Sequence, residues 1–363
     1  MQITSLDLDN FRNYERLHLD FEPGITLIYG DNAQGKTNLL EAVSMLSGSG
    51  SHRGAKDREM IRFGCEESHL KMMVLKDEAE LRIDMHLKNG RNKGIAVNRV
   101  PIRRNADFLG MVHTVFFSPE DLQIVKMGPA GRRKFIDTEL CLLDKVYLND
   151  YIQYRKVLEQ RNKLLKDVSY EPSLRDTLEM WDVQLVRYGR DIIERRKEFI
   201  RELYEITLPV HEKLSGGREK LELFYEPDVQ AEDFEEELKR SLEKDLRTKT
   251  TNTGPHRDDM SFMVTDEIQT DARIYGSQGQ QRTCALSLKL AQITLVKNKT
   301  GDLPVLLLDD VLSELDSGRQ NYLLDSIDGI QTFITCTGLD EFVDRNLSIS
   351  HAFKVEKGKI ADN

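Results

Sequence analysis

The sequence predicts an α/β fold that is interrupted by a helical insert and then completed. Three observations carry this prediction. A compact apolar strand at residues 25–29 precedes a glycine-bearing loop and a helix whose apolar residues share one face. Apolar residues then recur at spacings of three and four between about residues 130 and 206. Finally, residues 305–308 are continuously apolar, which is typical of a strand buried on both faces.

The bulk composition fits a chain of about two domains. There are 363 residues, and 39% of them are hydrophobic, enough for a substantial core. Changes of pattern divide the chain into residues 1–127, 128–252 and 253–363.

No apolar run approaches the ~20 residues that span a bilayer, and residues 1–10 lack the basic and apolar regions of a secretory signal. The net charge of −10 argues mildly against a protein coated by nucleic acid, although a local basic face is sufficient for DNA binding.

Cysteine and histidine usage bounds the chemistry further. The four cysteines are far apart and form no CxxC pair. We therefore expect neither a disulfide framework nor a zinc site, and a reducing cytoplasmic location fits best. The eight histidines are scattered without metal-ligand spacing.

The first α/β part is predicted to contain several strands and one helix. Alternating apolar residues predict short strands near residues 3–8 and 17–21. The pattern stays strand-like to about residue 117, and Asn89-Gly90 predicts a hairpin turn within it.

The insert reads as two long amphipathic helices. Their apolar spacing runs from residue 136 to residue 165, and again from residue 174 until Pro209 ends it, with Pro172 at the break. Two such helices predict an antiparallel hairpin, and ~35 residues at 1.5 Å per residue give a length of about 50 Å. The hairpin can be a projecting arm, which we favour, or part of an ordinary bundle.

The glycine-bearing loop carries the most specific motif of the chain. It matches GxxxxGK[ST] and lies between a strand and a helix, as the P-loop of nucleotide-binding proteins requires. The glycines let backbone N–H groups surround phosphates, and the helix N-terminus adds positive potential. Lys36 is expected to reach the β- and γ-phosphates of ATP, and Thr37 to ligate Mg²⁺. The motif residues are Gly30, Asp31, Asn32, Ala33, Gln34, Gly35, Lys36 and Thr37.

Two acidic residues follow the buried strand at residues 305–308. Asp309 is predicted to hold Mg²⁺, because P-loop folds bind ligands at the C-terminal ends of their strands. Asp310 is predicted to orient or deprotonate the attacking water. The alternative is a plain acidic turn, which the presence of the P-loop makes the weaker interpretation.

A third motif opens a helix rich in alanine, leucine and isoleucine. It contains Ser277, Gln278, Gly279 and Gln280. A small polar turn at a helix N-terminus can bind an anion, but taken alone Ser277 is better explained as an N-cap.

Together the three motifs resemble those of ABC-type ATPases. Residues 277–280, Ser-Gln-Gly-Gln, are similar to the Ser-Gly-Gly-Gln signature, and residues 309–316 are similar to the run that joins Walker B to the D-loop. A P-loop near the N-terminus, a helical insert, and a later signature and Walker B form the layout of SMC-type heads. The resemblance implies an ABC/SMC-type P-loop ATPase head with an inserted helical arm domain. Against that class, Asp310 replaces a glutamate and is one methylene shorter, so a slower base and a weak ATPase are expected.

A closer resemblance covers essentially the whole chain. Residues 30–42, 119–137 and 253–259 resemble hallmarks of the bacterial RecF family, in the same order. The resemblance implies a cytosolic recombination-mediator ATPase of DNA repair and replication, linked to the SOS response. It implies ATP-driven dimerisation, DNA binding near single-stranded gaps, and loading of RecA with RecO and RecR as partners. It also implies that Ser277, Gln278, Gly279 and Gln280 contact, in trans, the ATP that the other subunit's P-loop holds.

Several basic residues are candidates for DNA contact. The stretch from residue 88 to residue 104 contains no acidic residue, and either DNA contact or a charged hairpin face explains it. Its cations are Lys88, Arg91, Lys93, Arg99, Arg103 and Arg104. His52-Arg53 can lie near nucleotide or DNA, or in solvent. Residues 132–134 suit either a structural junction or DNA, and for His256 and Arg257 phosphate binding, packing and DNA contact all remain open.

Three other functions explain less of the sequence. A nuclease-coupled ATPase needs a second acidic metal-binding motif, which the sequence does not show. A small-molecule P-loop kinase needs neither the signature nor a helical arm. An SMC-like chromosome-organising head needs an insert long enough for a coiled coil and hinge.

Overall fold

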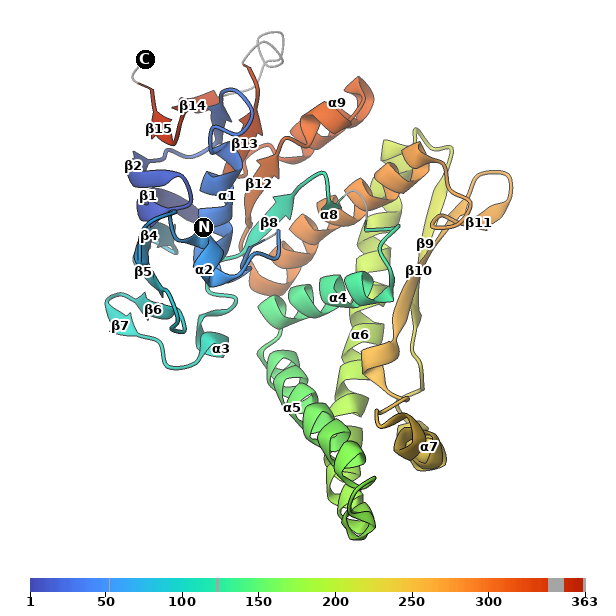
Figure 1. Cartoon of the computed structure of the whole chain (residues 1–363). Coiled ribbons are helices and arrows are strands. Elements are labelled where there is room, and N and C mark those ends of the chain that lie inside the picture. Colours follow the sequence, from blue (N-terminus) through green and yellow to red (C-terminus); the bar gives the residue numbers. More distant parts are fainter. Residues whose placement is uncertain (52, 122–123, 339–348, 362–363) are drawn as a thin grey trace. The chain divides into compact units, whose positions relative to one another are not determined.

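The computed structural model describes residues 1–51, 53–121, 124–338 and 349–361, and it contains two compact units. The first unit combines Met1–Asp121 with Gln292–Asn363, and the second is Leu122–Ala291 (Figure 1). The second unit thus differs from the insert predicted at 128–252. Residues beyond 252 join it because β9 (Lys220–Glu226) pairs antiparallel with β10 (Asp259–Thr265).

The first unit contains two six-stranded sheets. One is antiparallel, in the order β2-β1-β4-β5-β6-β7, and the other, β15-β14-β3-β13-β12-β8, is parallel except for β15. The predicted strands at residues 3–8, 17–21, 25–29 and 305–308 are confirmed. The strands are β1 (Gln2–Phe11), β2 (Tyr14–Asp20), β3 (Ile25–Tyr29), β4 (Glu67–Lys76), β5 (Ala79–Lys88), β6 (Gly94–Val97), β7 (Val100–Pro101), β8 (Thr114–Phe117), β12 (Val305–Asp309), β13 (Thr332–Cys336), β14 (Ile349–Glu356) and β15 (Lys359–Ile360).

One helix joins the two sheets into a core. Helix α1 (Lys36–Leu46) contacts β4 and β5 of the antiparallel sheet and β12 and β13 of the parallel sheet. Its residues Leu39, Leu40, Val43 and Leu46 are buried, as the apolar face predicted from the sequence requires. The remaining helices of this unit are α2 (Asp57–Met60), α3 (Asn105–Phe108), η4 (Leu312–Glu314) and α9 (Ser317–Ser326).

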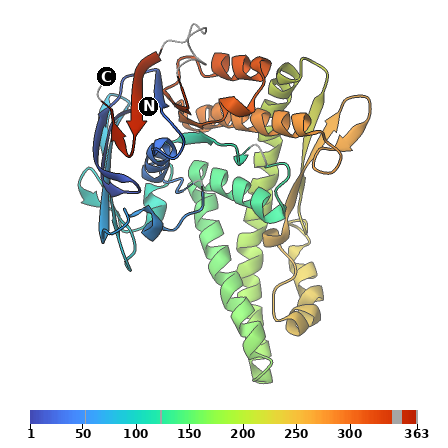
Figure 2. The same ribbon diagram turned by 45° about the horizontal axis from the view of Figure 1, so that its top comes forward.

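The second unit packs helices against a three-stranded sheet of order β11-β10-β9. Helix α6 contacts β9, and α4 contacts β10. Helices α5 and α6 pair along their lengths, and η2 joins them, which confirms the hairpin (Figure 2). Helix α7 contacts both, so the hairpin belongs to a small bundle, and its projection as an arm stays a prediction. The elements are α4 (Pro129–Leu143), α5 (Lys145–Asp167), η2 (Pro172–Thr177), α6 (Leu178–Leu214), α7 (Phe234–Thr248), η3 (Pro255–Arg257) and β11 (Gln269–Asp271), and α8 (Gln278–Thr300) begins here and ends in the first unit.

Two boundaries of the predicted helices were wrong. The first predicted helix is two helices, because the backbone of Asp144 is extended and its carboxylate accepts hydrogen bonds from the N–H groups of Val146 and Tyr147, which caps α5. The second helix does not end at Pro209 but continues to Leu214. An interior proline removes one helix hydrogen bond and crowds the carbonyl of the residue four positions earlier, and packing of α6 on β9 offsets that cost.

Buried ion pairs connect the elements of the second unit. The Arg132 side chain is fully buried, and its Nη2 and Nε lie 2.6 Å and 2.7 Å from the two carboxylate oxygens of Asp259. Arg132, one of the candidates for DNA contact, therefore has a structural role between α4 and β10. Within the described residues, no helix is long and apolar enough to cross a membrane.

Candidate nucleotide-binding site

The P-loop joins the end of β3 to the start of α1, as predicted. Gly30 and Gly35 have φ of 144° and 119°, a region that side chains rarely adopt. A Cβ on Gly30 would lie 2.4 Å from the carbonyl oxygen of Val355, and one on Gly35 would lie 2.5 Å from Nδ2 of Asn13. Gly30 is therefore required by its conformation and by the close approach of the Val355 backbone, and Gly35 by its conformation, with the Asn13 side chain packed against it.

Lys36 is held inside the loop. Its Nζ donates to the carbonyl oxygens of Gly30 at 2.5 Å and Asp31 at 2.8 Å, and the residue is buried. A buried ammonium on neutral carbonyl oxygens keeps its charge uncompensated, so it is suited to a phosphate.

Thr37 and Asp309 are brought together from positions far apart in the sequence. The Thr37 hydroxyl donates to Oδ1 of Asp309 at 2.7 Å. Asp309 ends β12, which is buried along its whole length and flanked by β13 and β8. A hydroxyl beside a carboxylate is the hard oxygen donor set that Mg²⁺ takes in P-loop sites, so these residues fit the ion.

Thr335 is a third member of this cluster. Its hydroxyl donates to Oδ1 of Asp309 at 2.8 Å and accepts from the N–H of Asp310 at 2.9 Å. No motif in the sequence selects a threonine on β13. The signal that could have found it is position, because β13 is a buried parallel strand whose C-terminal end shares the edge where β12 ends.

Asp310 has a strained backbone and an altered acidity. Its φ is 51°, uncommon for a residue with a side chain and frequent at functional sites. Burial and the neighbouring Asp309 carboxylate raise the pKa of Asp310, while Lys36 acts in the opposite direction. A carboxylate whose pKa is raised is a better proton acceptor once ionised, as a general base requires.

These residues surround one hollow of about 240 Å³. Arg53 also lines it, so the structure places this arginine beside the candidate nucleotide site, whereas His52 is outside the described residues. The full lining is Asn32, Ala33, Gly35, Lys36, Thr37, Asn38, Arg53, Asp309, Asp310 and Thr335.

Two turns from opposite ends of the chain brace the P-loop. Nδ2 of Asn13, in the turn between β1 and β2, donates to the carbonyl oxygen of Gln34 at 2.7 Å. The N–H of Gly358, in the turn between β14 and β15, donates to the same oxygen at 3.0 Å, and the N–H of Lys357 donates to Oε1 of Gln34 at 2.6 Å. Sequence reasoning missed all three braces, since nothing in a motif indicates which distant turns lie against it.

The signature motif lies in the second unit, at the start of α8. The Ser277 hydroxyl accepts from the N–H of Gln280 at 3.2 Å, and Oε1 of Gln280 accepts from the N–H of Ser277 at 2.9 Å. This reciprocal pair is a capping box, so Ser277 is an N-cap in this chain. Ser277 and Gln278 are exposed, and Gly279 and Gln280 are half-buried. The cap does not conflict with a contact in trans, which stays a prediction.

The basic stretch forms the end of β5, β6, β7 and their turns. Lys88 and Lys93 are already paired, with Glu67 at 3.0 Å and Asp57 at 3.6 Å. The other four cations are exposed and make no ion pair among the residues that the structure describes: Arg91, Arg99, Arg103 and Arg104. The predicted hairpin turn is confirmed, since β5 and β6 pair antiparallel around Asn89-Gly90.

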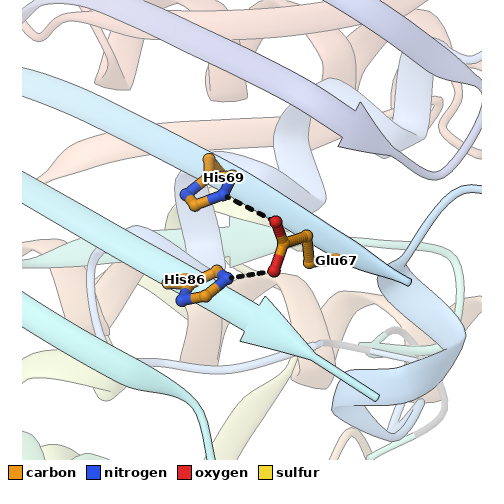
Figure 3. Close-up of side chains that lie close together, drawn as sticks. All are labelled: Glu67, His69 and His86. Carbon is orange, nitrogen blue, oxygen red and sulfur yellow. Dashed lines mark hydrogen bonds and ion pairs between the residues drawn. The ribbon is translucent and has the colours of Figure 1, made fainter. Parts of the chain in front are cut away.

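The sequence shows no histidines with the spacing of metal ligands, but spacing along the chain does not account for strand pairing. His69 and His86 lie opposite one another on β4 and β5, with parallel rings whose centroids are 4.2 Å apart. Figure 3 shows Glu67 beside both rings, with its carboxylate 3.3 Å from Nε2 of His86 and 4.0 Å from Nε2 of His69. The three residues offer ligand atoms within 4.8 Å of one another. Strand pairing brings them together from positions 17 residues apart, although Lys88 already occupies one oxygen of Glu67.

The chain is similar to known proteins along most of its length. A family model described as AAA domain matches residues 5–273. A DNA replication and repair protein RecF from Agathobacter rectalis is 55% identical over 360 residues, covering 99% of both chains. The RecF of Lachnoclostridium phytofermentans is 53% identical over 360 residues, with the same coverage. The chain belongs to the RecF family.

Solved structures agree with this assignment. A structure of the recombination mediator protein RecF with ATP, from the RecFOR pathway, has a TM-score of 0.92 and 38% identity. The alignment covers 99% of this RecF-family chain and 97% of that one. An Smc head domain from Pyrococcus furiosus matches with a TM-score of 0.57 at 16% identity, over 99% of this chain and 96% of that one, and shares the fold alone. The predicted ABC/SMC-type P-loop head is confirmed.

Proposed function

We propose that this chain is an ATP-dependent DNA-binding protein of DNA repair and replication, which helps to load RecA at single-stranded gaps with RecO and RecR. The observation that supports it most is a complete P-loop cluster in a chain that matches RecF relatives over its full length. One similar protein, 38% identical, was solved with ATP and is described as a recombination mediator.

In this proposal, the residues of the hollow bind ATP and hydrolyse it slowly. The loop N–H groups and Lys36 would hold the phosphates, while Thr37 and Asp309 would hold Mg²⁺, which would neutralise charge on the phosphate oxygens. Asp310 accepts a proton from the attacking water. Its short side chain and its position on a turn favour a weak ATPase that acts as a switch.

Dimerisation is proposed to use the exposed start of α8. The Ser277 hydroxyl and the Gly279 backbone of one subunit would contact the ATP that is held by the other subunit's P-loop. Loss of the γ-phosphate removes this contact and loosens the dimer. Lys36→Arg keeps the charge and is expected to fold normally while impairing dimerisation with ATP.

A test at Ser277 must distinguish its proposed contact with the other subunit's ATP from its role as the N-cap of α8. Ser277→Arg blocks the contact but also removes an N-cap, which costs about 1 kcal/mol. Ser277→Asp retains a capping side chain and places a negative charge toward the phosphates. We expect Ser277→Asp to bind ATP, to keep its melting temperature, and to stay monomeric in sedimentation velocity runs with ATP–Mg²⁺. A Ser277→Asp protein that dimerises like the parent would exclude the trans site.

For DNA, the exposed arginines of the basic stretch are the candidates. Lys88 and Lys93 contribute less, because Glu67 and Asp57 already neutralise them. The deciding experiment is fluorescence anisotropy of a labelled gapped duplex, with and without ATP–Mg²⁺. Binding that tightens with ATP and weakens with salt supports the proposal. Absence of DNA binding by an ATP-bound protein would remove the mediator role as an activity of this chain alone.

A further inference from the structure

Residues from two stretches that the sequence sets apart, 119–137 and 253–259, line one hollow in the second unit. The hollow has a volume of about 380 Å³, within the usual range of ligand sites, about 300–1,000 Å³. One face of α4 lines it through Arg133, Lys134 and Asp137, and α5 lines it through Tyr151 and Arg155. Asp137 follows Lys134 by three residues and Arg133 by four, and Arg155 follows Tyr151 by four, so each set shares one face.

One acidic and one basic group of the lining neutralise each other. Nη2 and Nε of Arg196 donate to Oδ1 of Asp137 at 2.7 Å and 3.1 Å, and Tyr147 donates to the same oxygen at 2.5 Å. Nη1 of Arg196 lies 2.7 Å from Oδ2 of Asp258, behind the wall. Arg196 is therefore engaged by two carboxylates, and Asp137 has its Oδ1 occupied by Arg196 and Tyr147.

The other cations of the lining make no ion pair with a carboxylate among the residues that the structure describes. Nη1 of Arg133 donates to the carbonyl oxygen of Asp258 at 2.5 Å, which is a neutral acceptor. Lys134 and Arg155 are exposed and make no ion pair within the described ranges. The hollow thus carries three uncompensated positive charges around a partly buried tyrosine ring, Tyr151.

His256 is a neutral part of the wall. Its Nε2 lies 3.1 Å from the carbonyl oxygen of Thr251 and must donate there, so its Nδ1 accepts from the Tyr154 hydroxyl at 2.7 Å. Burial lowers the pKa of His256, as do the nearby cations Arg257 and Arg133. The histidine therefore lines the hollow without adding charge. The positive charges of the hollow come from side chains of the two helices.

We propose that this hollow is a phosphate-binding site, separate from the P-loop, in which Arg133, Lys134 and Arg155 hold a phosphate group. A phosphate offers several acceptor oxygens and up to two charges, which three converging cationic groups match better than a carboxylate would. The phosphate can belong to a nucleic-acid backbone or to a free phosphate compound. If the phosphate belongs to a nucleic-acid backbone, the inference rests on the DNA binding proposed above. If it belongs to a free compound, the inference does not depend on DNA binding.

The test uses the full chain and a matched pair of variants. Lys134→Gln with Arg155→Gln removes two exposed cations of the hollow, and Lys156→Gln with Lys163→Gln removes two exposed cations of α5 outside it. Both double variants change the net charge equally, and all four residues are exposed, so melting temperatures should match the parent. The readouts are affinity for a labelled gapped duplex at several salt concentrations and calorimetric titration with inorganic pyrophosphate.

For a nucleic-acid source, the hollow variant loses about tenfold in DNA affinity, and its salt slope falls by about 0.9, the contribution of one duplex phosphate contact. The control variant keeps the slope. For a free phosphate source, DNA binding is unchanged, and the hollow variant alone loses one of two pyrophosphate sites, the P-loop being the other. Equal behaviour of both variants in both readouts overturns the site. A parent protein that binds no DNA refutes the proposed function, and the pyrophosphate titration still decides the hollow.

Discussion

Replacing Thr335 by valine removes one hydroxyl from the nucleotide site and keeps the shape of the side chain. That hydroxyl donates to the Asp309 carboxylate at 2.8 Å, accepts from the N–H of Asp310 at 2.9 Å, and lies 3.5 Å from the carbonyl oxygen of Leu308. Thr332, on the same strand, is an internal control. It is equally buried, and its hydroxyl donates only to the carbonyl oxygen of Ile330 at 2.9 Å.

The two substitutions should differ in how much stability they remove and in whether they weaken Mg²⁺ binding. A hydrogen bond to a charged group contributes about 1.5–3 kcal/mol, whereas a neutral one contributes about 1 kcal/mol. Thr335→Val is therefore expected to lower the free energy of unfolding by about 2–3 kcal/mol, and Thr332→Val by about 1 kcal/mol. Only the first frees Asp309 to rotate away from Thr37, and a loss of about 1.4 kcal/mol in orientation is a tenfold loss of Mg²⁺ affinity.

The assay is ATP hydrolysis by each variant over a series of Mg²⁺ concentrations, with urea unfolding run in parallel. We expect the Mg²⁺ midpoint of Thr335→Val to rise about tenfold and that of Thr332→Val to match the parent. If both variants show the parent's Mg²⁺ dependence, Thr335 does not orient Asp309, and the reasoning from its contacts is refuted.

Three further predictions concern acidity and packing. Because burial and Asp309 raise the pKa of Asp310, its contribution to stability is lost as pH rises above the ordinary value of 3.8, so Asp310→Asn should abolish hydrolysis yet melt higher at pH 7, with the gain shrinking toward pH 4. Arg161→Met leaves the fully buried Asp245 carboxylate without its partner at 2.7 Å and should cost about 3–5 kcal/mol in urea unfolding. Gly189→Ala would place its Cβ 2.3 Å from Cε1 of Phe234, and the overpacking should cost about 1–3 kcal/mol.

The sequence was sufficient where local chemistry determines structure. The strand, glycine loop and helix around Lys36 follow from residue order alone, and the apolar run before Asp309 identifies a central strand because few other structures bury every residue in succession. These two pieces meet, with Thr37 and Asp309 in contact, since parallel strands present their C-terminal ends at one edge.

It failed where two explanations share one pattern. The apolar spacing of a long helix is unchanged when an extended residue such as Asp144 interrupts it, and only the capping contacts of that carboxylate show the break. The pairing of His69 with His86 likewise depends on strand register, which their separation along the chain does not reveal. Ser277 shows a different limit, because one hydroxyl can be both an N-cap and a ligand of a partner's nucleotide.

The hydrogen bonds that two distant turns make to Gln34 of the P-loop lead to a last prediction, at Gly358. This glycine has φ of 73°, and a Cβ on it would lie 2.4 Å from the carbonyl oxygen of Asn13, so the two turns that hold Gln34 would be forced apart. Gly329 is the matched control, with φ of 72° and nothing within 4 Å of its Cβ position.

Both alanine variants share the backbone strain of a positive φ, about 1 kcal/mol, and should lose similar stability from that source. Only Gly358→Ala should also displace the loop, because the N–H groups at 357 and 358 bond to Gln34. We therefore expect a Kd for a fluorescent ATP analogue at least tenfold above that of Gly329→Ala. Equal Kd values would show that the P-loop keeps its shape without the turn between β14 and β15. A difference would mean that a motif near the start of the chain cannot bind its ligand until the last strands have folded against it.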